Sequence, residues 1–172
     1  GRTTIGIDVQ GGELVDLLAD LGTVDGRATA LDAVAEATDV LDGLVSCAAV
    51  SPIHPDPATV VSVNAFGALA VLDGLLPLLA GGSDPAAVAI SSIGAVDGSA
   101  DEMLVSVLRA GDEAAARDAA DDGTAYRSAI AYSSAKRFVA QGVRERARAW
   151  GDAGVRLNAV APGRMETPML DG

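Results

Sequence analysis

Short aliphatic runs, separated by longer stretches of helical character, most constrain how this chain can fold. The clearest run is Ala86 to Ile90, which leads into Ser91 and Ser92. About half of the chain is apolar (49%), yet the aromatic residues are only 2 Phe, 1 Trp and 2 Tyr, so small aliphatic side chains must build the core. Close packing of Val, Leu, Ile and Ala suits a parallel sheet covered by helices. A chain of 172 residues is long enough for one such α/β domain.

The expected elements alternate along the chain. Strands are predicted over five ranges: Thr3–Asp8, Leu14–Leu21, Leu44–Ala49, Ala86–Ile90 and Val155–Ala161. Helices are predicted over Arg27–Ala37, from a cap at Asp56 with Pro57 behind it to about Leu79, over Asp101–Ala110 and Asp112–Ala120 joined at Gly111, and over a long segment that starts near Tyr132.

A tyrosine and a lysine four residues apart, Tyr132 and Lys136, stand at the start of the last predicted helix. This spacing puts both side chains on one helical face, where an ammonium group can favour the ionised form of a phenol. Such a tyrosine can donate and accept a proton near neutral pH. Lys136 is also the only lysine of the chain, and a compact, mobile ammonium group fills a role that arginine fills badly. An ordinary exposed Tyr and Lys on a helix can have the same spacing, so the other motifs of the chain must decide between a catalytic pair and a surface pair.

Polar and small residues follow the predicted strands, at the edge where such folds bind ligands. Asp8 ends the first strand, where a carboxylate can accept hydrogen bonds from ribose hydroxyls and repel the extra phosphate of NADP, or can simply cap a turn. Asp20 and Leu21 end the second strand as a polar and apolar pair that could flank an adenine. Ala48 and Ala49 follow the third strand, and residues this small would let a cofactor lie close to the backbone.

Several other polar residues have both a structural and a functional interpretation. Asn64 lies among apolar neighbours, so its amide needs a partner, either a backbone carbonyl or a water in a proton relay. Ser91 and Ser92 would point into a ligand crevice at the end of their strand, although paired serines are also common turn formers. Cys47 is predicted to be a small buried apolar residue, and His54 to be a loop residue within a proline-rich turn.

Charge and cysteine content limit the possible partners and compartments. A formal net charge of −12 argues against nucleic acids and anionic membrane surfaces. Cys47 is alone, so a disulfide framework within the chain is impossible and a cytoplasmic location is expected. The longest apolar stretch, Val60 to Ala80, is interrupted by Asn64, Asp73 and Pro77, which predicts a buried helix and not a membrane span. No metal site is expected.

Taken in order, these motifs resemble the short-chain dehydrogenase/reductase family. The resemblance rests on Asp8, Cys47-Ala48-Ala49, Val63-Asn64-Ala65-Phe66-Gly67, Ile90-Ser91-Ser92, Tyr132-Ser133-Ser134-Ala135-Lys136, and Ala161-Pro162-Gly163 with Thr167. It covers nearly the whole chain, and the joint occurrence of the motifs is far more specific than any one of them. The resemblance implies a Rossmann-type, doubly wound parallel sheet that binds NAD.

The resemblance also implies a role for each matching residue. Tyr132 would be the general acid/base, Lys136 its electrostatic partner and a ligand of the cofactor ribose, and Ser92 would hold the carbonyl or alkoxide oxygen. Asn64 would order a relay water, and Asp8 would select NAD. The cofactor-binding set implied in this way is Asp8, Asp20, Leu21, Ala48, Ala49, Tyr132, Lys136, Pro162, Gly163 and Thr167, with the last three bordering the nicotinamide.

The chain departs from the family pattern in three respects. Ser92 and Tyr132 are forty residues apart, so a helical insertion at about residues 95–125 separates them, as in the 3α-hydroxysteroid dehydrogenase/carbonyl reductase branch, with coniferyl-alcohol dehydrogenases close behind. Ala49 stands where the family usually has glycine. The family's glycine-rich phosphate turn is not in this sequence. Residues 1–172 are therefore predicted to form a single partial domain without the first βα unit and the C-terminal strand, and with a sheet divided where that first strand would lie.

The sequence therefore predicts an NAD-dependent oxidoreductase that interconverts a secondary alcohol, such as a 3α-hydroxysteroid or an aromatic alcohol, and its carbonyl compound. A nucleotide-sugar epimerase shares the Tyr-x-x-x-Lys spacing, but Pro162-Gly163 speaks against it. The alternative from another class is a noncatalytic binding or interaction module that kept the family's surface. The expected partners are a small-molecule substrate and, in a homodimer, a second copy, because the insertion should obstruct a four-subunit assembly.

Overall fold

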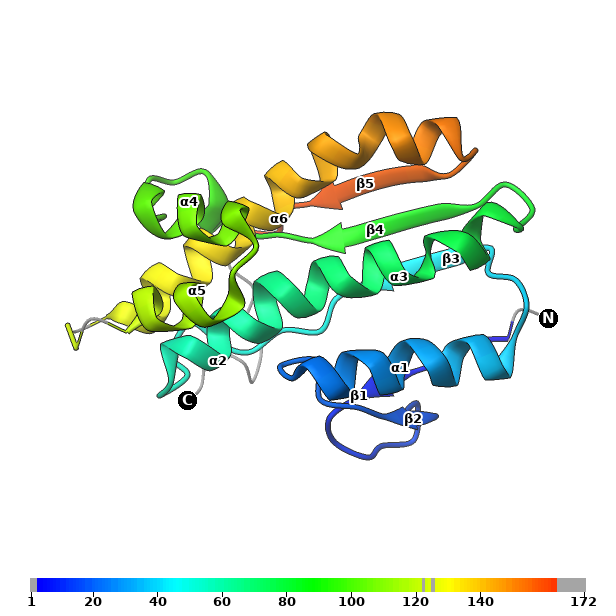
Figure 1. Cartoon of the computed structure of the whole chain (residues 1–172), viewed down its shortest axis with the longest axis horizontal. Coiled ribbons are helices and arrows are strands. Elements are labelled where there is room, and N and C mark those ends of the chain that lie inside the picture. Colours follow the sequence, from blue (N-terminus) through cyan, green and yellow to red (C-terminus); the bar gives the residue numbers. More distant parts are fainter. Residues whose placement is uncertain (1–2, 122, 125, 164–172) are drawn as a thin grey trace.

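The computed structural model describes residues 3–121, 123–124 and 126–163 (Figure 1). The strands are β1 (Ile7–Asp8), β2 (Leu17–Leu18), β3 (Gly43–Ser46), β4 (Ala86–Ile90) and β5 (Arg156–Val160). The helices are α1 (Val24–Ala37), α2 (Pro57–Val61), α3 (Ala68–Ala80), α4 (Glu102–Ala110), α5 (Glu113–Ala120) and α6 (Arg127–Asp152). A π-helical segment, η1 (Ser62–Gly67), joins α2 to α3, and a 3-10 turn, η2 (Ile93–Ala95), follows β4. The predicted order of elements is confirmed, but the first two strands are much shorter than predicted.

The strands form two separate parallel sheets. β1 pairs with β2, and β4 lies between β3 and β5 in a three-stranded sheet. Within the described residues no strand joins the two sheets, so the predicted α/β architecture with a divided sheet is confirmed. Each of the first two predicted strands has only two residues paired with a neighbouring strand. Strand pairing requires a neighbour that exchanges backbone hydrogen bonds with the segment.

One face of the three-stranded sheet is covered by α3 and α6. Their shared core contains, among others, Leu72, Leu79, Ala87, Ala89, Val139 and Trp150. On the opposite face Val45 is 63% exposed and Val160 is 49% exposed. Cys47 lies two residues after Val45, just beyond the end of β3, so the two side chains lie on the same open face of the sheet. Cys47 is exposed. The prediction that Cys47 is buried is therefore wrong.

α2, η1 and α3 form one continuous helix from Pro57 to Ala80. Asp56 caps its start by accepting hydrogen bonds from the backbone N–H groups of Ala58 and Thr59, and Pro57 occupies the first turn, as predicted. By length and composition this helix could also cross a membrane, but half of its most apolar window is buried inside the protein. The π-helical segment widens the helix around Asn64, and such segments are frequent at functional sites.

The predicted insertion consists of α4 and α5. Asp101 and Asp112 cap the two helices, and Gly111 ends α4 with a φ angle of 77°, as expected for a left-handed helix terminus. The insertion packs on α2 and on the N-terminal half of α6 (Figure 1), in a core that contains Val60, Val61, Leu104, Leu108, Ala116, Ala131 and Ala135. α6 begins at Arg127, so Tyr132 lies in its second turn and not at its start.

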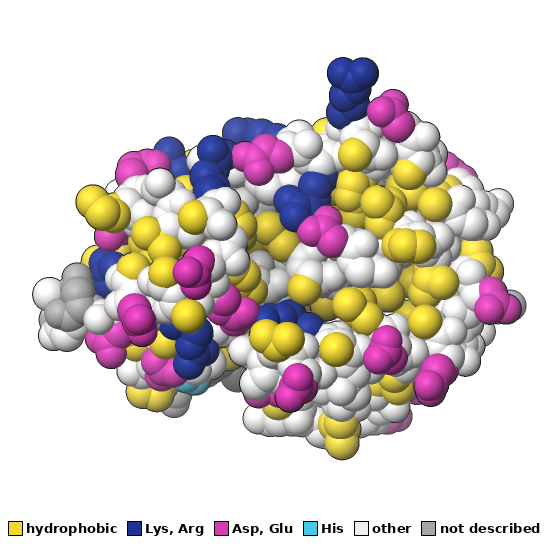
Figure 2. All heavy atoms as spheres, in the orientation of Figure 1, with side chains coloured by type: hydrophobic (Ala, Val, Ile, Leu, Met, Phe, Trp, Pro, Cys, Tyr) yellow, Lys and Arg dark blue, Asp and Glu magenta, His cyan; other side chains and the backbone are white. Residues whose placement is uncertain are grey.

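Charged and apolar side chains are unevenly spread over the surface. Figure 2 shows acidic side chains scattered over the visible face, with hydrophobic ones gathered on the right, where α3, β4 and β5 lie. Near the end of α6, two charged residues form ion pairs with other helices: Arg146 pairs with Asp73 of α3 (2.5 Å) and Glu145 with Arg109 of α4.

Candidate active site

Tyr132 and Lys136 lie on one face of α6, as their spacing predicted. The ammonium nitrogen of Lys136 is 5.6 Å from the centroid of the Tyr132 ring, within the range of a cation–π contact. The same nitrogen donates a hydrogen bond to the carbonyl oxygen of Ile90 (2.9 Å), which joins α6 to the end of β4. Lys136 is only 2% exposed, and this burial lowers its pKa to about 8, while the neighbouring Cys47 opposes the shift.

The two serines after β4 have different surroundings. Ser91 is 2% exposed, and its hydroxyl donates a hydrogen bond to the backbone carbonyl of Lys136 (2.8 Å), so it anchors β4 to α6. Ser92 is half-buried and caps η2, because its oxygen accepts a hydrogen bond from the N–H of Gly94 (3.2 Å). A Cβ atom at Gly94 would lie 2.9 Å from the hydroxyl oxygen of Ser133, so η2 can approach α6 this closely only with glycine. Ser92 is therefore the serine of the pair that a ligand could reach.

Asn64 holds the loop that follows β3. Its side-chain oxygen accepts a hydrogen bond from the N–H of Val50 (2.8 Å), and its side-chain nitrogen donates one to the carbonyl of Val50 (3.0 Å). The residue is fully buried, so this backbone-like pairing satisfies an amide that would otherwise be costly to bury. Both ends of the amide are engaged, which favours the structural interpretation of Asn64. The predicted role of Asn64 in ordering a relay water stays a prediction.

The predicted adenosine-side residues lie in two turns. Asp8 is exposed at the end of β1, and its carboxylate accepts a hydrogen bond from the N–H of Gln10 (2.9 Å). Asp20 is also exposed and accepts one from the N–H of Gly22 (2.8 Å). Gly22 rests on η1, since a Cβ atom there would lie 3.0 Å from the side chain of Val63. Two strand-end loops, those after β2 and β3, therefore meet at the helix that carries Asn64.

The nicotinamide-side residues meet at the same edge of the sheet as Ser92. The N–H of Ile93 donates to the carbonyl of Pro162 (2.9 Å), which places the segment after β5 beside the end of β4. Gly163 follows Pro162 and is exposed; Ala48 is exposed and Ala49 half-buried after β3. Thr167 lies outside the described residues. The structure thus brings Ser92, Tyr132, Lys136 and Pro162 to one end of the three-stranded sheet.

Three arginines that sequence reasoning did not select tie the insertion to these elements. Arg27 of α1 pairs with Glu113 of α5 (2.5 Å) and donates to the carbonyl of Leu21 (3.1 Å). Arg117 of α5 donates to the hydroxyl of the fully buried Ser62 in η1 (2.7 Å). The third, Arg127, begins α6. These contacts join residues far apart in the sequence, so no local pattern could have identified them.

Arg127 binds both insertion helices at once. Its guanidinium group donates to the carbonyls of Ala119 (2.5 Å) and Ala120 (2.7 Å) at the end of α5, and pairs with Asp101 at the start of α4 (3.1 Å). The N–H of Asp101 in turn donates to the hydroxyl of Ser134 (2.9 Å), which lies between Tyr132 and Lys136 in the sequence. A continuous polar network therefore connects the insertion to the helix that carries the Tyr–Lys pair.

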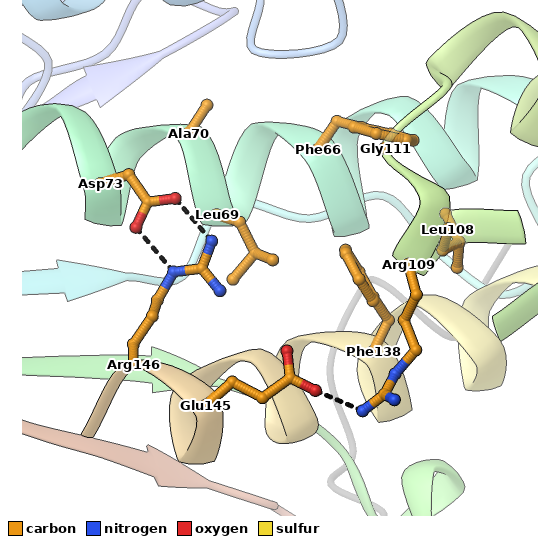
Figure 3. A pocket seen from close by; sticks show the side chains of 10 residues that line it. All are labelled: Phe66, Leu69, Ala70, Asp73, Leu108, Arg109, Gly111, Phe138, Glu145 and Arg146. Atoms are coloured by element: carbon orange, nitrogen blue, oxygen red, sulfur yellow. Dashed lines mark hydrogen bonds and ion pairs between the residues drawn. The ribbon is translucent and has the colours of Figure 1, made fainter. Parts of the chain in front are cut away.

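A pocket of about 530 Å³ lies away from this site (Figure 3). It opens between α3, α6 and the end of α4, with an apolar floor that includes Phe66 and Phe138. The ion pairs Asp73–Arg146 and Glu145–Arg109 stand on its rim, as Figure 3 shows. Neither Ser92 nor the Tyr–Lys pair lines it, so this pocket is not where the predicted reaction would occur.

Comparisons with known proteins agree with this geometry. Residues 119–172 match the family model described as enoyl-(acyl carrier protein) reductase. Over 172 residues the chain is 42% identical to 3-alpha-hydroxysteroid dehydrogenase/carbonyl reductase of Comamonas testosteroni, covering 99% of this chain and 66% of that protein. The chain belongs to the short-chain dehydrogenase/reductase family. The predicted family membership is thereby confirmed.

Two solved structures are similar in fold to this chain. The crystal structure of a 3-alpha-hydroxysteroid dehydrogenase from Pseudomonas sp. B-0831, complexed with NADH, matches with a TM-score of 0.90 and 44% identity over 99% of this chain and 66% of that one. The aldohexose dehydrogenase of Thermoplasma acidophilum matches with a TM-score of 0.66 and 20% identity over 96% and 58% of the two chains, a likeness of fold alone. The chain thus spans 66% of the length of both hydroxysteroid dehydrogenases.

Proposed function

We propose that this protein is an NAD-dependent oxidoreductase that interconverts a secondary alcohol and its carbonyl compound. The observation that carries the proposal is the buried ammonium group of Lys136, 5.6 Å from the ring of Tyr132. Relatives named as 3-alpha-hydroxysteroid dehydrogenases, one of them complexed with NADH, support NAD and a hydroxysteroid-like alcohol as cofactor and substrate.

The described residues fit a dinucleotide along the ends of the strands. The exposed carboxylate of Asp8 suits the adenosine ribose, and the exposed Cys47 and Ala48 offer backbone without bulky side chains. Pro162 lies beside Ser92, where a nicotinamide would border the substrate. When bound, NAD would supply the hydride acceptor for alcohol oxidation.

The side chains of the site would handle the proton and the developing charge. Tyr132 would take the proton of the alcohol hydroxyl as the carbonyl forms and would return it in the reverse reaction. The hydroxyl of Ser92 accepts from Gly94, so its own hydrogen remains to bind the substrate oxygen. The nearby ammonium group of Lys136 would stabilise negative charge on the phenol oxygen.

Replacing Tyr132 with phenylalanine tests the proposal. In the full-length protein, Tyr132→Phe should lower alcohol oxidation by about a hundredfold or more, because the ring remains and only the transferable proton is lost. NAD binding, measured by calorimetric titration, should stay near that of the wild type. Ser106→Ala, which removes a hydroxyl from the exposed side of α4, serves as the control. Turnover that survives in Tyr132→Phe at more than about one hundredth of the wild-type rate would contradict the proposal.

The alternative, a noncatalytic binding module, has less support. The structure keeps the Tyr–Lys pair, and it keeps Ser92 within reach of a ligand. A wild-type protein that binds NAD and small ligands without any turnover of secondary alcohols would favour the alternative.

A further inference from the structure

The loop after β2 is held tightly by the two helical segments beside it. The N–H and the hydroxyl of Thr23 both donate to the carbonyl of Asp20 (3.1 Å each), at the start of α1. A Cβ atom at Gly26 of α1 would lie 2.0 Å from that same carbonyl oxygen. On the other side, a Cβ atom at Gly67 of η1 would lie 2.8 Å from the carbonyl oxygen of Leu21. Only glycine fits at these two positions, so α1 and η1 press directly on the backbone of the loop.

Arg27 of α1 adds a charged contact to this loop. Its Nη1 donates a hydrogen bond to the carbonyl of Leu21 (3.1 Å), and the residue is only 8% exposed. Hydrogen bonds from an ionised donor are stronger than those between neutral groups. A guanidinium group buried to this degree also needs an opposite charge, because water no longer solvates it fully.

Glu113 of the insertion supplies that opposite charge. Its two carboxylate oxygens accept hydrogen bonds from Nη1 (3.3 Å) and Nη2 (2.5 Å) of Arg27. Nη1 therefore bridges the carboxylate of Glu113 and the carbonyl of Leu21. Glu113 lies in the first turn of α5, where the helix dipole favours a carboxylate. The two-point pairing fixes the plane of the guanidinium group, and with it the direction of the hydrogen bond to the loop.

This ion pair joins two separate hydrophobic clusters. α1 and the small sheet pack on α3 in a cluster that contains Val34 and Val71, with Leu21 packed against it. α5 contributes Ala116 and Ala120 to the cluster of the insertion. Among the described residues the two clusters share no member. The charged pair is therefore a direct connection between the insertion and the predicted adenine side of the site.

We propose that Arg27 and Glu113 are positioning residues of the cofactor site, through which the insertion holds the loop after β2 in the conformation that binds adenine. The loop follows the carboxyl end of its strand, the edge at which such sheets bind ligands. Asp20 accepts from the N–H of Gly22 through one oxygen, and its carboxylate retains acceptor capacity for the amino group of an adenine. This inference rests on the proposed function, because NAD is the ligand that brings the adenine.

The test measures how two dinucleotides bind to the full-length protein, by isothermal titration calorimetry. NAD and nicotinamide hypoxanthine dinucleotide differ at one position, because an oxo group of hypoxanthine replaces the amino group of adenine. The wild type should bind NAD about tenfold more tightly. Arg27→Met removes the donor to the Leu21 carbonyl and should reduce this preference to about twofold or less. Glu113→Gln keeps the shape but not the charge, and should reduce it to about threefold.

Two further variants separate positioning from a general loss of stability. Arg27→Lys keeps a charged donor and should retain a preference of about fivefold. Arg146→Met breaks a two-point pair between α6 and α3, away from the loop, and should keep the preference within about twofold of the wild type. Unfolded protein lowers the titrated stoichiometry and leaves the ratio of the two dissociation constants unchanged.

Two results would overturn the positioning role and leave the proposed function standing, because neither measurement requires turnover. One is a wild-type preference that persists in both Arg27→Met and Glu113→Gln. The other is a wild type that binds both dinucleotides equally well. A wild type that binds neither dinucleotide would overturn the positioning role and the proposed function together.

Discussion

Lys136 combines a buried charge with the position next to Tyr132. Its ammonium group donates a hydrogen bond to the carbonyl of Ile90, and the residue is only 2% exposed. Burial of a charge costs free energy, which is why the pKa falls to about 8. The fold tolerates this cost at the residue that the proposed mechanism needs most, which is the pattern expected of a functional group.

The burial of Lys136 makes stability depend on pH. The folded pKa of about 8 lies below the unfolded value of 10.5, so between these values the unfolded state binds more protons. The free energy of unfolding should therefore rise as pH increases through this window, by an amount on the order of 3 kcal/mol. Urea denaturation at pH 7.5 and 10.5 would measure it. In Lys136→Met this rise should disappear, whereas an unchanged rise would show that other groups cause it.

Asp8 sets the expected choice between NAD and NADP. Its exposed carboxylate would face the ribose hydroxyls and repel a 2′-phosphate, so the wild type should prefer NAD. Asp8→Ala should narrow the ratio of kcat/KM for NAD over NADP, measured with one alcohol. Asp32→Ala, which removes an exposed carboxylate from α1, is the charge-matched control. Equal use of both cofactors by the wild type would reduce Asp8 to the role of a turn residue.

At the scale of elements, the insertion is fastened to the helices that carry the site. Arg27, Arg117 and Arg127 connect α5 with α1, η1 and α6 respectively. The insertion therefore does more than lengthen the chain between Ser92 and Tyr132, since it supports both helices that border the candidate site. The insertion lies over the N-terminal half of α6, where it should obstruct a four-subunit assembly. The homodimer stays a prediction, which light scattering would test by measuring the mass of the assembly.

Arg127 should be the most important of these links for stability. Its side chain is 10% exposed and binds two carbonyls and a carboxylate, so Arg127→Met removes the donor of three hydrogen bonds. Removing one partner of such a network should lower the free energy of unfolding by about 3 kcal/mol. Arg148→Met provides the control, because Arg148 is 95% exposed and its 3.9 Å pair with Asp152 should contribute less than about 0.5 kcal/mol. If chemical denaturation gave the same loss in the free energy of unfolding for both substitutions, Arg127 would not stabilise the contact between the insertion and α6.

At the scale of the whole molecule, the divided sheet is the main weakness. β3 is an edge strand of the larger sheet, and the sheet face that carries Val45 is open to solvent in the described residues. Unpaired edges and apolar faces of this kind favour association between chains.

The polypeptide of these 172 residues, studied alone, should therefore lack a cooperative thermal transition or should aggregate. Differential scanning calorimetry and size-exclusion chromatography would measure the two outcomes. A single cooperative transition together with tight NAD binding by this polypeptide would contradict the prediction and would require a phosphate site within it.

The sequence alone determined the features that depend on local chemistry. Asp56 caps its helix as predicted, and the two insertion helices begin directly after Asp101 and Asp112, close to their predicted starts. Gly111 ends α4 where the two helices were predicted to join. Each of these residues acts on backbone groups within its own turn. The Tyr132–Lys136 face follows from helical geometry in the same way. The family motifs gave the order of strands and helices for the same reason, since every motif lies within one loop or turn.

Only the tertiary structure decided which distant group each polar side chain binds. Asn64 engages Val50, Ser91 engages Lys136, and Arg127 engages both insertion helices. The exposure of Cys47 was decided in the same way, by which face of the sheet is covered. A side chain's partner across the fold depends on packing between elements, and burial obliges every polar group to find one. The partner therefore cannot be predicted from the neighbouring residues in the sequence.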